Sequence, residues 1–256
     1  MDKLIQFLKS IIWKMLIHIL NSMNSNSLGD FAYQLVSEKT KIVPAKEALQ
    51  LLFTMDNHLY FLEKRIAVLY GNGIHPKHRH IRYHDFFVER ISNGSKVLDV
   101  GCGNGAVAFD VAQKTNSHVL GIDLDGEFIQ SARQQFSHPN IQYIVGDARI
   151  DLPNEMFDYV ILSNVLEHIE ERVEFLINLQ KRISPASIFI RVPLFERDWR
   201  VPLKQELGLE WRLDKDHKTE YTLDSFEMEL NAAKLKTHHQ ETRWGEIWAE
   251  VKPFDT

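Results

Sequence analysis

A glycine-rich loop at Gly101–Gly105 follows the β-rich run Lys96–Val100 and precedes a helical stretch. A strand that turns sharply into a helix brings backbone N–H groups close to a ligand, and glycines are needed because a Cβ atom would block that approach. The loop also fits the dinucleotide pattern G-x-G-x-x-G/A through Gly101, Gly103 and Ala106. The glycines therefore predict a cofactor loop but do not by themselves choose the cofactor.

Three acids at the ends of successive β-rich runs narrow that choice. Asp99 lies two residues before Gly101, where a carboxylate can hold a cationic amine but would repel a pyrophosphate. Asp123 ends the second run, where an acid can accept both hydroxyls of a ribose, as NAD also requires. Asp147 ends the third run and can accept the exocyclic amine of adenine. The acids together predict a nucleoside cofactor, and Asp99 argues against NAD.

Four stretches occur in order along residues 90–256: VLDVGCGNG, GIDLD, VGDA and FDYVILSNVLEHI. Their order and spacing resemble those of class I methyltransferases that use S-adenosylmethionine (SAM). The resemblance implies methyl transfer from SAM. It also implies a Rossmann-like α/β fold, with helices on both faces of a seven-stranded mixed sheet whose last strand is antiparallel.

The resemblance further implies which residues hold SAM. Asp99 and the glycine loop would contact the methionine end, Asp123 would bind the ribose, and Asp147 the adenine amine. Leu124 would pack on the adenine ring. The full implied set is Asp99, Gly101, Gly103, Asp123, Leu124, Asp147, Ala148 and Asn164. A dinucleotide site, or a glycine turn that binds no nucleotide, remains the alternative.

The segment after the fourth β-rich run should face the methyl group, and it carries Glu167 and His168. His168, with Glu167 beside it, is the candidate base or acceptor-orienting group for an oxygen acceptor. Alternatively, both residues merely begin the helical stretch Val165–Ile183. No metal is assigned, because Asn164 replaces the first acid of the E-x-x-E-H metal-binding run found in similar O-methyltransferases. Glu167, His168 and His217 remain an alternative three-ligand site, and His217 is also a candidate for contact with the acceptor.

Two further segments are expected to build the acceptor pocket. Tyr83 lies in the histidine-rich segment before the glycine strand and is expected to cover SAM, since aromatic residues enter from that side in similar enzymes. Arg197 and Trp199 follow the fifth β-rich run, and this pair suits a sugar face or an anionic group. Ordinary packing of a lid explains Trp199 equally well.

The bulk composition bears on the partner and the compartment. The chain has 35 acids against 30 lysines and arginines, a net charge of −5, which argues against nucleic acid as the main partner. We therefore expect a small-molecule or glycan hydroxyl as acceptor. A small-RNA ribose 2′-O-methyltransferase and a SAM-binding protein without transfer activity are the alternatives. Cys102 is the one cysteine, which favours a reducing compartment and a cytoplasmic location.

Residues 1–90 read as an N-terminal helical extension, and residues 91–256 as the methyltransferase domain. Apolar residues recur at helical spacing in Met1–Met23, namely Leu4, Leu8, Ile11, Ile12, Met15 and Ile19. Such a helix would cap the main domain or form a homodimer face. Alternatively, it would lie in the plane of a membrane, with Lys3, Lys9 and Lys14 near the headgroups. We expect no membrane-spanning helix.

Overall fold

The computed structural model describes residues 2–72 and 74–254 and divides into two compact units, Met1–Tyr60 and Phe61–Thr256. The side chains of residues 1–5, 7–9 and 11–12 lie outside the described part. The predicted roles of Lys3 and Lys9, and of the apolar residues up to Ile12, therefore stay predictions. The compact units meet after Tyr60, whereas the sequence predicts an extension that runs to residue 90.

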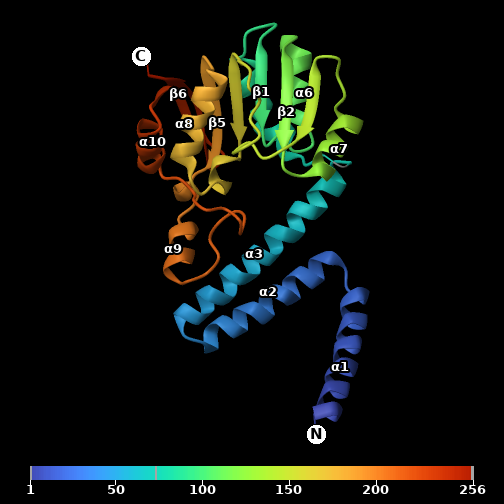
Figure 1. Cartoon of the computed structure of the whole chain (residues 1–256). Helices are drawn as coiled ribbons and strands as arrows, with labels where there is room; N and C mark the ends of the chain where they lie inside the picture. Colours follow the sequence, from blue (N-terminus) through green and yellow to red (C-terminus); the bar gives the residue numbers. More distant parts are fainter. Residues whose placement is uncertain (1, 73, 255–256) are drawn as a thin grey trace. The chain divides into compact units, whose positions relative to one another are not determined.

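The first unit is helical (Figure 1). It contains α1 (Asp2–Ser22), α2 (Ser25–Ile42) and the first part of α3 (Ala45–Tyr70). Asn24 begins α2, because its side chain accepts a hydrogen bond from the backbone N–H of Ser27 at 2.9 Å. Exposed apolar side chains are common on α1, with Trp13, Met15 and Ile19 at 62%, 61% and 55% exposed. Among the described residues, no helix is both long and apolar enough to cross a membrane.

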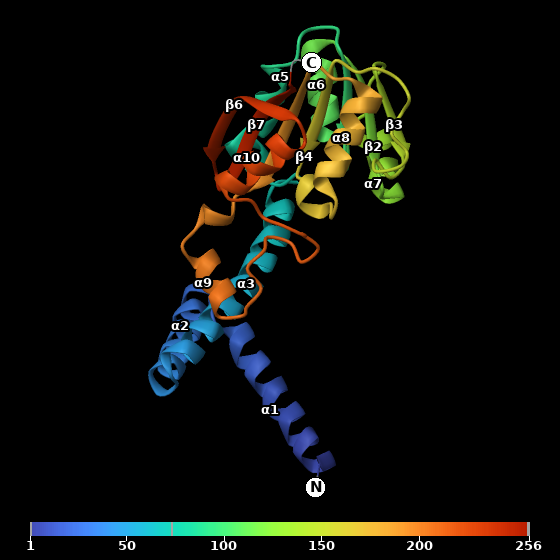
Figure 2. The same ribbon diagram turned by 60° about the vertical axis from the view of Figure 1, so that its left-hand side comes forward.

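The second unit is built on one seven-stranded sheet in the order β3-β2-β1-β4-β5-β7-β6. The strands are β1 (Lys96–Val100), β2 (His118–Asp123), β3 (Ile141–Val145), β4 (Tyr159–Ser163), β5 (Ser187–Pro193), β6 (Leu235–Arg243) and β7 (Glu246–Pro253). The first five strands are parallel, and β7 runs antiparallel to both β5 and β6. The predicted Rossmann-like mixed sheet with an antiparallel last strand is confirmed. The hairpin β6–β7 lies beside α10, Leu223–Ala232 (Figure 2).

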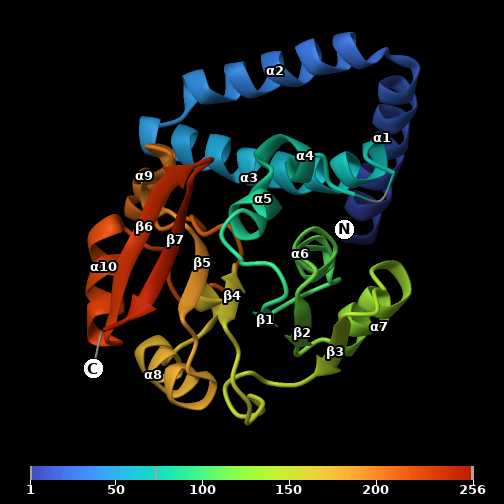
Figure 3. The same ribbon diagram turned by 90° about the horizontal axis from the view of Figure 1, so that it is seen from above.

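Helices cover both faces of the sheet (Figure 3). One face carries α5 (Tyr83–Val88), α6 (Ala106–Thr115) and α7 (Gly126–Gln135), and the other carries α8 (Arg172–Ile183) and α10. Short helices complete the unit: α4 (Lys77–Ile81), η1 (Leu166–His168), η2 (Phe195–Arg197) and α9 (Arg200–Glu206). This arrangement places all the loops after β1 to β5 at one edge of the sheet, where ligands bind in open parallel sheets.

The predicted helical stretch Val165–Ile183 is wrong in its first part. Asn164 has a left-handed backbone with φ of 58°, and Ile169 is extended. These two residues isolate η1 as a single turn before α8 begins at Arg172. Glu167 and His168 therefore belong to a separate turn at the end of β4, and a regular helix does not fix their direction.

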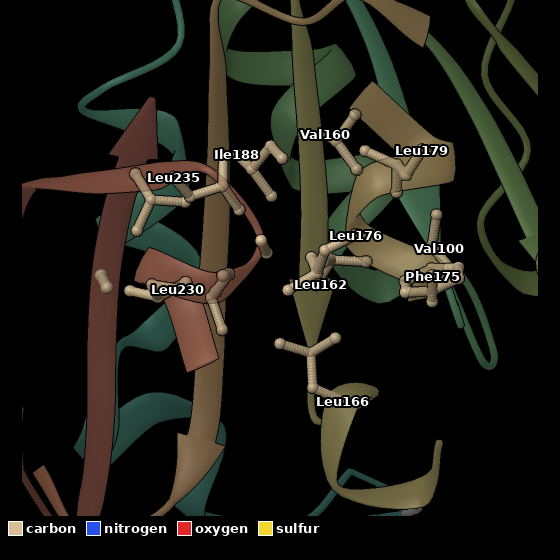
Figure 4. Close-up of a cluster of buried hydrophobic side chains, with 14 of the residues drawn as sticks. Val100, Val160, Leu162, Leu166, Phe175, Leu176, Leu179, Ile188, Leu230 and Leu235 are labelled. Atoms are coloured by element: carbon tan, nitrogen blue, oxygen red, sulfur yellow. The ribbon is translucent and has the colours of Figure 1, made fainter. Parts of the chain in front are cut away.

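A buried apolar cluster anchors that turn. Figure 4 shows Leu166 of η1 beside Leu162 of β4, with Leu176 of α8 packed close by. All three side chains are fully buried. Because Leu166 cannot leave this cluster without exposing its side chain to water, the next two residues are held at the edge of the sheet. The core thereby positions Glu167 and His168.

Candidate active site

The glycine loop turns out of β1 under a close packing constraint. The backbone N–H of Gly101 donates to the carbonyl of Ile122 at 2.8 Å. Gly103 and Gly105 both have positive φ, 53° and 85°. A Cβ on Gly105 would lie 2.5 Å from the hydroxyl of Tyr143, whereas one on Gly103 would meet nothing within 4 Å. Gly105 is therefore required by packing, while Gly103 leaves open space at the loop surface.

That open space belongs to a cleft of about 600 Å³ at the carboxyl edge of the parallel strands. Seven of the eight predicted cofactor residues line it: Gly101, Gly103, Asp123, Leu124, Asp147, Ala148 and Asn164. His168, Asp216 and Lys218 line the same cleft. Seven predicted cofactor residues and the predicted catalytic His168 thus share one cavity, whereas Asp99 does not line it.

Asp123 is held by the backbone at the wall of the cleft. One carboxylate oxygen accepts the N–H of Gly103 at 2.8 Å, and the other accepts the N–H of Asp125 at 2.9 Å. This carboxylate therefore fixes the shape of the glycine loop. It also remains open on the cleft side, where it can accept a ligand hydroxyl.

Asp99 lies behind the loop and is 2% exposed. Burial, with the nearby charge of Asp123, raises the pKa of Asp99 to about 8. Its Oδ2 atom has no hydrogen-bond partner among the described residues. A buried polar atom without a hydrogen-bond partner lowers the free energy of unfolding, so a cationic or hydrogen-donating ligand group would stabilise this oxygen.

Asp147 lines the cleft, but its oxygens are paired. The guanidinium Nε of Arg149 donates to both carboxylate oxygens, at 2.9 and 3.0 Å. These hydrogen bonds lower the pKa of Asp147. A ligand amine at this position would have to share or displace Arg149, which itself lines the cleft and was not predicted as a site residue.

Glu167, His168 and His217 lie together, although His217 is far from the other two in the sequence. A ligand atom of each lies within 4.8 Å of the others, and the two imidazole rings meet edge to face at 4.7 Å. His168 is hydrogen-bonded through Nδ1 to Asp216 at 3.0 Å. The backbone N–H of Lys218 donates to the carbonyl of Glu167 at 2.6 Å, which ties the two segments together.

Glu167 is fully buried in this cluster. Its Oε1 accepts a hydrogen bond from the side-chain amide of Asn164 at 2.8 Å, and its Oε2 has no partner among the described residues. Burial raises the pKa of Glu167 to about 7, although the hydrogen bonds oppose the shift. The cluster therefore offers one unpartnered carboxyl oxygen beside two imidazoles, a set that can accept a proton or ligate a cation.

Three residues predicted to build the acceptor pocket, Tyr83, Arg197 and Trp199, differ in their burial and in their partners. Tyr83 is buried, with the guanidinium of Arg191 4.1 Å from its ring centre and its hydroxyl 3.1 Å from Nδ1 of His78. Burial raises the pKa of Tyr83 to about 12. Arg197 is also mostly buried, and Trp199 is 70% exposed. Neither Tyr83, Arg197 nor Trp199 is among the residues that line the cleft.

Asp216 and Lys218 were not singled out from the sequence, and both line the cleft. They flank His217, which the sequence did single out, so their closeness to that histidine in the chain was the available signal. Arg191 carried no signal, because a single arginine near the end of β5 follows no motif.

A family model described as a methyltransferase domain matches residues 97–186. The chain carries a class I SAM-dependent methyltransferase domain. The matched residues of this methyltransferase domain run from β1 to the loop before β5 and include the glycine loop, the three acids and η1.

Relatives and solved structures agree with this domain assignment. The chain is 31% identical over 142 residues to the ribosomal protein L11 methyltransferase of Burkholderia lata, covering 53% of this chain and 45% of that protein. It thus spans about half the length of the curated relatives it matches. One chain of the complex between the Haloferax volcanii Trm112 methyltransferase activator and a methyltransferase superposes with a TM-score of 0.59 at 16% identity, covering 71% of this chain and 93% of that one.

The magnesium protoporphyrin IX methyltransferase of Synechocystis PCC 6803, solved with bound SAH, superposes with a TM-score of 0.54 at 17% identity. The match covers 68% of this chain and 83% of that one. At such identities the superpositions show a shared fold. The domain therefore has the fold of SAM-dependent methyltransferases, and its acceptor is not given by these comparisons.

Proposed function

We propose that this chain transfers a methyl group from SAM to a hydroxyl of a small molecule or glycan, through the domain at residues 91–256. The observation that carries the proposal is the Asp216–His168 hydrogen bond at the wall of the cleft that also contains the cofactor residues. A histidine oriented by a carboxylate is the usual arrangement for a general base.

The proposed reaction is an in-line displacement. The acceptor oxygen attacks the methyl carbon of SAM, the carbon–sulfur bond breaks, and S-adenosylhomocysteine leaves with the electron pair of that bond. The hydroxyl proton passes to His168. Most of the rate would come from positioning and from exclusion of water, since displacement at a sulfonium requires little else.

The cofactor contacts follow the cleft. Oδ2 of Asp99 would take the amine at the methionine end of SAM, which satisfies its missing hydrogen bond. Asp123 would accept the ribose hydroxyls while it holds Gly103. The adenine would lie against Leu124 and Ala148, with its amine on Asp147 in place of Arg149.

A metal-dependent version of the same reaction is the second candidate. It is favoured by the unpartnered Oε2 of Glu167, which lies beside His168 and His217. A divalent cation on these three ligands would lower the pKa of the acceptor hydroxyl. Oxygen and imidazole ligands suit Mn²⁺ or a similar ion.

Three alternatives to this function stay open. The ribosomal protein L11 methyltransferase relative suggests a protein acceptor, and His217 with its neighbours suggests an RNA ribose. The third alternative is a protein that binds SAM without transferring a methyl group. Incubation with radiolabelled SAM and a panel of small hydroxyl compounds, oligosaccharides, small RNA and ribosomal protein tests all of them.

The His168→Gln variant belongs in the same assay, with the exposed His238→Gln variant as its control. Label transferred to a hydroxyl compound and reduced at least tenfold by the His168→Gln change alone would support the proposal. Label on protein or RNA only, or SAM binding without transfer, would overturn it.

The N-terminal residues 1–23 would add a binding surface separate from the cleft. We propose that residues 1–23 lie along a lipid surface, with a homodimer face as the alternative. The exposed Trp13, Met15 and Ile19 support a covered apolar face in either case. The cytoplasmic location inferred from Cys102 remains a prediction.

A further inference from the structure

Glu220 lies three residues after His217 in the chain and pairs with its imidazole. Nδ1 of His217 is hydrogen-bonded to Oε1 of Glu220 at 3.1 Å, and both residues are buried. The same oxygen accepts the backbone N–H of Leu213 at 2.5 Å. Glu220 therefore links the imidazole of His217 to the backbone at Leu213.

Arg197 supports the other oxygen of Glu220. Its guanidinium pairs with Oε2, donates to the carbonyl of Leu194 at 3.0 Å and donates to the carbonyl of Trp211 at 2.8 Å. Arg197 is thus committed to a buried ion pair and two backbone carbonyls. The sequence suggested an acceptor contact for Arg197, whereas these bonds give it a supporting role behind the cleft.

These contacts determine which ring nitrogen of His217 carries its proton. An ionised carboxylate can only accept hydrogen bonds, so Nδ1 of His217 must donate to Glu220. Burial alone would raise the pKa of Glu220, but the hydrogen bond from His217 and the charge of Arg197 lower it overall. In the neutral imidazole, Nε2 is then left with its lone pair. Since Nδ1 is hydrogen-bonded to Glu220, Nε2 is the ring nitrogen of His217 that can interact with Glu167 or His168.

The second imidazole has a similar partner in a different environment. His168 is held through Nδ1 by Asp216 at 3.0 Å, but the Asp216 side chain is 67% exposed, whereas that of Glu220 is fully buried. Water competes for the exposed pair and screens its charges. The buried pair therefore constrains its histidine more strongly than the exposed pair does.

We propose that Glu220, supported by Arg197, is a positioning residue that holds His217 as the Nδ1–H tautomer, so that its Nε2 lone pair serves the acceptor site. The inference rests on the proposed function, because it assigns His217 to the same reaction centre. A group that orients a ligating or catalytic histidine typically changes affinity or rate by about tenfold to a hundredfold when it is altered.

The test reads the tautomer directly, without turnover. The full-length protein is labelled with ¹⁵N-histidine, and the ring nitrogens of His217 are assigned by their absence from a His217→Gln variant. The native protein should show Nδ1 protonated and Nε2 unprotonated at neutral pH. Glu220→Gln should populate the other tautomer, because a carboxamide can also donate a hydrogen bond. Arg197→Gln/Glu220→Gln does the same without leaving a buried arginine unpaired.

Activity provides the second readout. Glu220→Gln should lower kcat about tenfold or more and leave SAM affinity unchanged, while Asp216→Asn leaves the His217 tautomer as it is. An Nε2–H tautomer in the native protein, or a His217 spectrum unchanged by both Glu220 variants, overturns the inference. If no acceptor is methylated, the proposed function fails while the tautomer result still decides this inference.

Discussion

The side-chain amide of Asn164 donates to Oε1 of Glu167 at 2.8 Å and leaves Oε2 buried without a partner. A carboxylate at position 164 would repel Glu167, whereas the amide stabilises its ionised form. The pair lies in one turn between β4 and α8, next to the cleft. The groups that can accept a proton or bind a cation here are thus the carboxyl of Glu167 and the imidazoles of His168 and His217, rather than two carboxyls.

The first prediction concerns metal removal. Methyl transfer should survive dialysis against EDTA, because the Asp216–His168 pair provides a base without a cation. Activity is measured before chelation, after it, and after addition of Mg²⁺ or Mn²⁺. Loss of activity that Mn²⁺ restores would contradict the expectation and assign the Glu167–His168–His217 cluster to a cation.

The second prediction concerns Asp99 and pH. The folded-state pKa of about 8 lies above the ordinary value of 3.8, so between these values the folded chain keeps a proton that the unfolded chain has released. Stability from this group therefore falls as pH rises through that window. Asp99→Asn removes the penalty and should raise Tm near pH 8, by roughly 2–4 °C per kcal/mol gained, but not near pH 4.

Thermal unfolding without SAM at the two pH values measures this difference, with the exposed Glu170→Gln variant as control. The Asp99→Asn variant should also bind SAM about tenfold more weakly, since the charge that would hold the amine is gone. An equal change in Tm at both pH values would show that Asp99 does not keep its proton in the folded chain.

The third prediction separates cofactor binding from loop structure. Asp123→Ala should abolish micromolar SAM binding, because it removes the proposed ribose acceptor and the hydrogen bond to Gly103. Asp125→Ala is the matched control. The Asp125 side chain caps α7 by accepting from the N–H groups of Glu127 and Phe128, and its loss should cost about 1 kcal/mol of stability. Calorimetric titration with SAM and S-adenosylhomocysteine measures the affinity of both variants. Binding of NAD(H) instead of SAM by the native chain would overturn the cofactor assignment.

The fourth prediction compares two glycines of one loop. Gly105→Ala should destabilise the protein strongly, because its Cβ would lie 2.5 Å from the hydroxyl of Tyr143. Gly103→Ala should cost only about 1 kcal/mol for its positive φ, yet weaken SAM binding about tenfold, because Gly103 lines the cleft and the proposed cofactor would lie close to it. Tm and calorimetric affinity are measured for both variants. Normal SAM affinity in Gly103→Ala would place the ligand elsewhere.

The fifth prediction concerns α1. Vesicles containing anionic lipid should carry the full chain upward in a flotation gradient but leave a chain starting at Asn24 behind. The residues removed include Trp13, Lys14 and Met15, which suit a lipid interface, and each lysine contributes about 1 kcal/mol at an anionic surface. Lys9→Glu/Lys14→Glu should reduce flotation. Equal recovery of both chains in the soluble fraction, with a dimer mass by light scattering for the full chain alone, would favour the homodimer.

The sequence by itself determined the fold and the cofactor loop. The strand–helix alternation, the glycines and the acids at strand ends are local patterns, because each residue is near its structural partners in the chain. The seven-stranded mixed sheet with an antiparallel last strand follows from the family resemblance and is confirmed, whereas the order of the strands comes from the structure. The positions of Asp123 and Gly103 on one cleft likewise follow from neighbouring strand ends.

Only the tertiary structure decided the surroundings of the catalytic candidates. In the chain, α8, β5 and α9 lie between His168 and His217. The contact between the two rings arises where the N–H of Lys218 donates to the carbonyl of Glu167. Arg197 was expected at the acceptor, but it pairs with Glu220 in the interior. Such assignments depend on which buried charges meet in three dimensions. A residue's type and spacing state what it can bond, but not which partner will be within reach.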